Sequence, residues 1–156
     1  MKRNYISLVY RISYVRNISF ILFFVLMMLI NAFLSSFISR FFFQKRVTEG
    51  FIGFNTISEE VFLVMIAAPL METCLFQQLP FSLLSKFLNP ILIVLLSASL
   101  FGIIHFYNPV YMVSAFFGGL LLSTAYYLKI KEGKAFLLTC LIHSIYNGIV
   151  SILHHI

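Results

Sequence analysis

Five long apolar segments occupy most of this 156-residue chain, and the short stretches between them hold the basic residues. The segments cover residues 18–38, about 60–84, 90–106, 111–128 and 135–153. Each approaches or exceeds the ~20 residues that an α-helix needs to cross the hydrocarbon core of a bilayer. The pattern predicts an all-α, polytopic transmembrane helical bundle of about five spans that lies in the cell membrane.

The composition excludes a soluble domain. Hydrophobic residues make up 61% of the chain and charged residues 10%, whereas average soluble domains have ~45–50% and ~25%. The net charge of +6 does not indicate nucleic-acid binding, because the basic residues flank the apolar segments instead of forming one face. Membrane lipid is the expected surrounding, and Cys74 and Cys140 are expected to be buried free thiols within apolar segments.

The basic residues also predict an orientation. Residues 1–17 are interpreted as a basic cytoplasmic or interfacial tail, and 18–38 as a retained first transmembrane helix that is too long for a signal peptide. An N-terminus in the cytoplasm places eight basic residues inside and three, at positions 40, 45 and 46, outside. The positive-inside rule therefore favours a cytoplasmic N-terminus.

Small residues recur four positions apart on two of the predicted helices. Ala98 and Gly102 have this spacing in the third segment, and Ala115 and Gly119 have it in the fourth, beside Ser114 and Gly118. In lipid, such spacing lets two helix backbones approach closely. These positions are therefore predicted to be sites of close helix packing, and the alternative is that small residues are simply tolerated there.

Three titratable residues lie within apolar segments: Glu72, His105 and His143. A charge at the centre of a bilayer costs ~2.5–3.5 kcal/mol or more, so such residues indicate a functional site. Glu72 follows Pro69, which should kink the helix and free backbone carbonyls. A lone carboxylate at this depth takes up a proton, unless a neighbouring imidazole keeps it ionised.

Each of the two imidazoles has a companion one helical turn away. Phe101 precedes His105 by four residues, and Asn147 follows His143 by four. The Asn147 amide can hold one ring nitrogen of His143 or point at the same reacting oxygen. At ~1.5 Å per residue, Glu72 and His143 lie ~18 Å and ~12 Å from the starts of antiparallel spans, near the midplane, whereas His105 falls nearer the end of a short helix.

The order of these motifs, a Glu on the second segment, F-x-x-x-H on the third and H-x-x-x-N on the fifth, resembles the CPBP family. This family comprises CAAX-processing and bacteriocin-processing glutamic intramembrane proteases and is also called the Abi family. The resemblance covers residues 60–153 and implies a four-helix CPBP-like protease core there. It implies catalytic roles for four residues, with Phe101 in support: Glu72 as the base that activates water, His105 as its helper, and His143 and Asn147 as oxyanion stabilisers.

The chain departs from the family pattern at two positions of the first motif, which usually reads E-E-x-x-x-R. Thr73 stands in place of the second Glu, and Gln77 stands in place of the Arg. Because both charges are lost together, no unpaired charge is left in the membrane. We interpret Thr73 and Gln77 as supporting residues that can hydrogen-bond one another, and the departure bears directly on whether the chain is active.

Metal-free hydrolysis is expected, because no H-E-x-x-H helix is present. The alternative is a zinc ion held by Glu72, His105 and His143. A covalent mechanism through Cys140 is less favoured, because it lies on the same predicted helix as His143 and two such residues rarely make an in-line pair.

These features predict an intramembrane endopeptidase that acts on a membrane-associated peptide or a lipidated protein. A bacteriocin and a signalling peptide are candidate substrates. The alternative is a bacteriocin immunity or binding protein with weak or no proteolysis. A bundle that uses Glu72 and the histidines as a proton relay is a third hypothesis, disfavoured because no inverted repeat is present.

Overall fold

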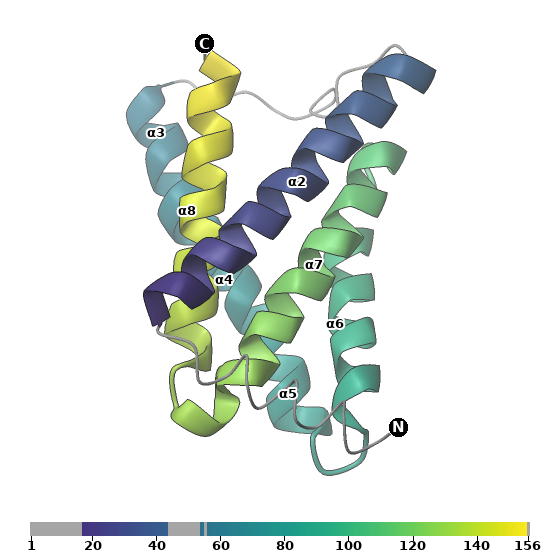
Figure 1. Ribbon diagram of the computed structural model, residues 1–156, viewed down its shortest axis with the longest axis vertical. Helices are drawn as coiled ribbons and strands as arrows, with labels where there is room; N and C mark the ends of the chain where they lie inside the picture. The colour runs from purple at the N-terminus through teal and green to yellow at the C-terminus, as the bar shows by residue number, and fades with distance from the viewer. Residues whose placement is uncertain (1–16, 44–53, 55, 156) are drawn as a thin grey trace.

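The computed structural model describes residues 17–43, 54 and 56–155, and all regular structure within these ranges is helical (Figure 1). The predicted all-α bundle is therefore confirmed. Among the described residues, three helices are long and apolar enough to cross a membrane: Asn17–Phe42, Pro109–Glu132 and Ala135–Leu153. The predicted tail lies almost wholly outside the described residues, and the helix that follows it, α2, runs over Asn17–Phe43.

The second apolar segment forms one continuous helical rod that contains two wider, π-helical stretches. Its elements are α3 (Ile57–Phe62), η1 (Leu63–Ala67), α4 (Ala68–Glu72), η2 (Thr73–Gln78) and α5 (Leu79–Leu84), with η1 and η2 in π-helical geometry. Each π-helical stretch lies just before a proline, Pro69 or Pro80. A proline ring clashes with the carbonyl four residues earlier and lacks an N–H, so a wider turn there accommodates it.

The third segment is a short helix. Helix α6 (Pro90–Ile103) has 14 residues, about 21 Å at 1.5 Å per residue, which is less than the ~30 Å hydrocarbon core. It ends before the predicted Phe106, because Asn108 caps the next helix, α7 (Pro109–Lys129), by accepting hydrogen bonds from Val110 N and Tyr111 N at 3.0 and 3.1 Å. A residue before proline also avoids helical backbone angles, so the chain must turn here.

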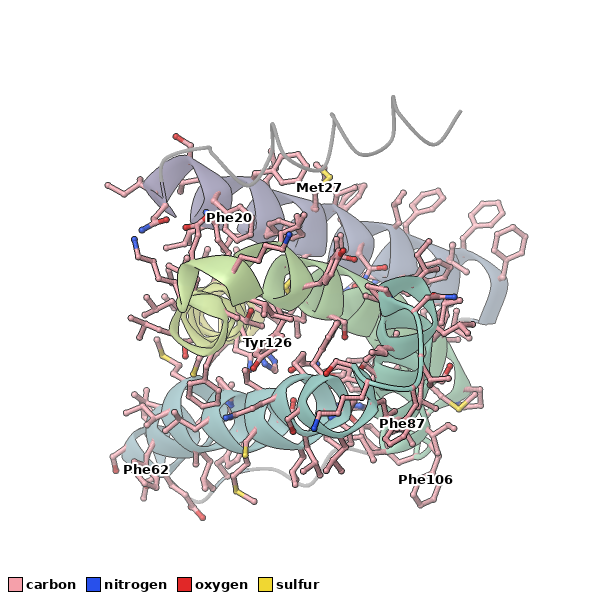
Figure 2. The ribbon with its side chains drawn as sticks, turned by 90° about the horizontal axis from the view of Figure 1, so that it is seen from below. Phe20, Met27, Phe62, Phe87, Phe106 and Tyr126 are labelled. Carbon is pink, nitrogen blue, oxygen red and sulfur yellow. The ribbon has the colours of Figure 1, made fainter. Side chains whose placement is uncertain are left out.

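Successive helical segments run in alternating directions (Figure 1). Helices α2, α6 and the last helix, α8 (Ala135–His155), run in one direction. Helix α7 and the rod, which comprises α3 to α5, run in the opposite direction. Helix α2 packs against α7 and α8, and the rod contacts α8 from the other side. Seen from below, α7 and α8 separate α2 from the rod (Figure 2). In the same view Phe62, Phe87 and Phe106 point outward, whereas Tyr126 lies between the helices.

Helices α6 and α7 approach each other closely at small residues. A Cβ atom added at Gly119 would lie 3.0 Å from both Ala98 Cα and Phe101 Cβ, and one added at Gly102 would lie 3.0 Å from Phe116 Cβ. Gly118 differs, because an added Cβ there would meet no atom within 4 Å. Close packing at the small residues is thus confirmed for Gly102 and Gly119 but not for Gly118.

A buried core joins α2 to α7 and α8. Its apolar members include Phe20, Phe24, Val25 and Met28 of α2, Leu122 and Ala125 of α7 and Ile142 of α8. Asn31 adds a polar link, because its Nδ2 donates to the Ser114 carbonyl at 3.0 Å. Of the two free thiols, Cys140 is buried as expected, but Cys74 is exposed, because it lies on the outward side of η2.

A buried charge lies at the end of α7. Lys129 is 1% exposed, and its Nζ pairs with Glu132 Oε1 at 2.8 Å. The ammonium also lies 4.7 Å from the centre of the Phe20 ring. A cation at the C-terminal end of a helix is favourable with the helix dipole, and the carboxylate and the aromatic face replace part of its hydration.

Candidate active site

Glu72 and His143 come together between the rod and α8. Glu72 ends α4, and His143 lies on the buried side of α8. Glu72 Oε2 is 3.7 Å from His143 Nε2, and the two side chains are 22% and 5% exposed. This separation is longer than a direct hydrogen bond, so Nε2 remains available to a third atom beside the carboxylate.

The backbone before Glu72 is held by Asn147. In the π-helical register of η1, the N–H of Ala68 bonds to the carbonyl of Leu63, five residues earlier. The next carbonyl, that of Val64, would bond to residue 69, but Pro69 has no N–H. Asn147 Nδ2 donates to this Val64 oxygen at 2.9 Å. Asn147 therefore contacts the rod, and not a ring nitrogen of His143 as one interpretation of the sequence had it.

His105 lies in the turn after α6 and has a defined tautomer. Its Nδ1 is 2.7 Å from the carbonyl oxygen of Phe101. A carbonyl oxygen can only accept a hydrogen bond, so Nδ1 carries the hydrogen and the neutral ring keeps a lone pair on Nε2. An imidazole in this state can accept a proton through Nε2.

The ring of Phe101 lies between the two histidines. Its centre is 5.0 Å from that of His105 and 5.8 Å from that of His143, and Phe76 of η2 packs against it at 5.8 Å. The turn after α6 thus directs His105 back toward the bundle interior. The depth mismatch expected from the sequence is reduced, because His105 lies beside the same ring as His143.

A cluster of tyrosines beside His105 was missed in the sequence. The Tyr111 ring lies 5.0 Å from the His105 ring in an edge-on arrangement, and Tyr107 lies 5.5 Å from Tyr111. A phenol in an apolar segment has a hydroxyl that needs a partner, and this was the available signal. Together the two rings extend the aromatic contacts of His105 to the turn that joins α6 to α7.

Thr73 and Gln77 are fully buried on the inner side of η2, but they do not hydrogen-bond one another. Thr73 Oγ1 and both polar atoms of the Gln77 side chain have no hydrogen-bond partner. The expected contact assumed α-helical geometry, in which residues four apart are neighbours. Helix η2 is π-helical, so its backbone hydrogen bonds span five residues and not the four assumed in that expectation.

The described side chains do not form a ready metal centre. Within residues 17–43, 54 and 56–155, no three His, Cys, Asp or Glu side chains gather closely enough to hold a metal ion. Of the three zinc ligands considered, Glu72 and His143 are in contact, whereas the Nδ1 of His105 is engaged by a carbonyl. Zinc binding would therefore require His105 to approach through Nε2.

The fold and the site define a helical membrane protein with a carboxylate and two imidazoles between its helices. Residues 55–149 match the family described as type II CAAX prenyl endopeptidase Rce1-like. The match covers more than half of the chain, so the protein belongs to this family of membrane endopeptidases, in agreement with its CPBP resemblance. No curated protein and no solved structure matches the chain.

Proposed function

We propose that this protein is an intramembrane endopeptidase that hydrolyses a peptide bond with water activated at Glu72. The observation that carries the proposal is the approach of Glu72 Oε2 to His143 Nε2 at 3.7 Å between two helices. A carboxylate base next to an imidazole donor is an arrangement that can both activate water and stabilise an oxyanion.

In the proposed reaction, Glu72 takes a proton from water while the water oxygen attacks the substrate carbonyl carbon. The Nε2 lone pair of His105 orients that water. The oxyanion accepts a hydrogen bond from Nε2–H of His143, and the second amide hydrogen of Asn147, whose first is bonded to Val64, adds to this stabilisation. When the C–N bond breaks, the proton on Glu72 passes to the leaving amine. The reaction requires no covalent nucleophile and no metal.

The proposed substrate is a membrane-associated peptide or a lipidated protein, with a bacteriocin or a signalling peptide as candidates. The family description names CAAX prenyl endopeptidases, and the exposed apolar surface of the bundle, including Phe33, Phe37 and Phe62, suits a lipid environment. The alternating directions of the helical segments support a multi-pass arrangement, and the basic residues favour a cytoplasmic N-terminus.

A second candidate is a bacteriocin immunity or binding protein in which the same helices bind a peptide without cutting it. The observation that favours it is the neutral pair Thr73 and Gln77, which stands where the family motif usually has Glu and Arg. Under this hypothesis Glu72 and His143 contribute to binding or structure and not to hydrolysis.

The two candidates are separated by scoring two phenotypes in the same cells. Wild type, Glu72→Ala, His105→Ala and His143→Ala would be expressed, membrane insertion confirmed, and peptide processing measured by mass spectrometry beside resistance to added bacteriocin. The endopeptidase proposal expects all three variants to lose processing. The binding-protein hypothesis expects two results: the wild type processes no peptide, and all three variants still confer resistance.

A further inference from the structure

Six side chains in the bundle interior carry polar atoms without a protein partner. Among the described residues these are Thr73, Gln77, Ser97, Ser123 and Thr139, together with Nδ1 of His143. The first five are 0% exposed and His143 is 4% exposed. Native proteins leave few buried polar atoms unsatisfied, so six in one bundle require an explanation.

The register of the helices places four of these side chains at one level, one turn from the Glu72–His143 contact. On α8, Thr139 precedes His143 by four residues, and on α6, Ser97 precedes Phe101 by four. The rod runs the opposite way, so Gln77, which follows Glu72, lies toward the same end as Thr139. The remaining member is Ser123.

Ser123 reaches this level from α7. It follows Gly119 by four residues, and Gly119 packs on Ala98 and Phe101 of α6. Because α7 runs antiparallel to α6, Ser123 lies near the level of Ser97. The π-helical stretch η2, which carries Gln77, packs against α6, α7 and α8. We call Gln77, Ser97, Ser123 and Thr139 the polar layer.

The chemistry of the polar layer selects its ligand. It contains three hydroxyls and one amide, which both donate and accept, and no carboxylate or cationic side chain that would select an ion. The nearby buried cation, Lys129, is paired with Glu132. Water both donates and accepts hydrogen bonds, so it can bind to hydroxyl and amide groups together. Buried waters make about three hydrogen bonds to polar atoms of this kind.

We propose that the polar layer binds ordered water and that one of these waters holds Nδ1 of His143. The bound water would position a residue of the proposed active site, so its importance for catalysis rests on the proposed function. A water that donates to Nδ1 keeps the ring hydrogen on Nε2, the nitrogen that faces Glu72. Thr139 and Gln77 are then positioning residues, which act on the site through bound water.

Hydration of the layer is testable on the full chain in lipid bilayers by water-edited solid-state NMR, with water itself as the probe. The side-chain amide of Gln77 should receive magnetisation from water rapidly despite its burial. The Asn31 amide, which is bonded to Ser114 between α2 and α7, is the matched control and should receive it slowly. Slow transfer to Gln77, equal to that of Asn31, would overturn the proposal.

A pair of substitutions at Thr139 tests the link to His143. Thr139→Val removes a water ligand, so it should lower the melting temperature and convert the ¹⁵N signals of the His143 ring from one tautomer to a mixture. Thr139→Ser should retain the wild-type values of both. A dry layer requires the reverse: Thr139→Val would raise the melting temperature, because it deletes an unsatisfied hydroxyl, and would leave the ring signals unchanged.

These measurements do not depend on catalysis. If the protein never cleaves a peptide but the Gln77 amide is hydrated and the His143 tautomer follows Thr139, the water layer stands and only the proposed function fails. If cleavage requires Glu72 but the layer is dry, the proposed function stands and the water layer is refuted.

Discussion

Asn147 of α8 donates a hydrogen bond to the carbonyl oxygen of Val64 at 2.9 Å, across 83 positions of sequence. This is the carbonyl that Pro69 cannot satisfy in the π-helical register of η1. The bond fixes the rod against α8 two turns before Glu72. Asn147 thus has a structural role, and in the proposed reaction the same side chain would also stabilise the oxyanion.

The partnership with Pro69 gives a test by double substitution. Asn147→Ala should lower the free energy of unfolding by about 1–2 kcal/mol, because it leaves a partly buried carbonyl without a donor. Pro69→Ala restores an N–H at position 69, so Asn147→Ala should cost measurably less in that background. Thermal unfolding of the four proteins in one detergent measures the coupling, and strictly additive effects would contradict it.

Gly119 and Gly118 form a matched pair for the α6–α7 contact. Gly119→Ala places a Cβ 3.0 Å from Ala98 Cα and Phe101 Cβ, so we expect a loss of about 1–3 kcal/mol from overpacking. Because Phe101 supports both histidines, cleavage should fall as well. Gly118→Ala meets no atom within 4 Å and should be neutral or stabilising by up to about 1 kcal/mol. Equal effects of the two substitutions on stability would contradict the packing described here.

The buried Lys129 depends on Glu132. Glu132→Gln removes the negative charge 2.8 Å from Lys129 Nζ but keeps an oxygen acceptor, so it should destabilise the protein by about 0.5–1.5 kcal/mol, the difference between a charge-assisted and a neutral hydrogen bond. Lys134→Gln, at an exposed position in the loop before α8, is the control and should change little. Chemical unfolding in detergent would compare the two, and a Glu132→Gln protein as stable as Lys134→Gln would show that Lys129 does not depend on the Glu132 carboxylate.

Metal dependence distinguishes the two cofactor hypotheses. Metal-free hydrolysis at Glu72 expects full cleavage activity after dialysis against a strong chelator. The zinc alternative expects that activity is lost on chelation and restored by stoichiometric zinc. The measurement is the initial rate of peptide cleavage by the same preparation before chelation, after it, and after zinc is returned.

Much of the fold follows from local pattern in the sequence. Apolar segment length predicts the helices, and the small residues at 98, 102 and 119 predict close helix packing there, because small side chains let helix backbones approach. The depth of Glu72 and His143 along antiparallel helices likewise brings them to one level. These inferences need only helix geometry and the length of each segment.

The details that were not predicted depend on how segments fit one another. The π-helical turns before Pro69 and Pro80 and the Asn147–Val64 bond require a partner helix that is distant in sequence. Thr73 and Gln77 lie in one of these turns, and their side chains make no hydrogen bond to each other. The early end of α6 results from the Asn108 cap, whose effect outweighs the apolar run from 90 to 106.

The central claim is that Glu72 is the base for hydrolysis, and one pair of rates tests it most directly. Wild type, Glu72→Gln and the control Glu59→Gln, in the first turn of α3 away from the site, would be reconstituted in the same liposomes with a peptide that the wild type cleaves. We expect Glu72→Gln to lose at least about 100-fold in kcat, on the scale of a lost general base, while Glu59→Gln keeps the wild-type rate. A folded Glu72→Gln protein that cleaves at the wild-type rate would contradict the account.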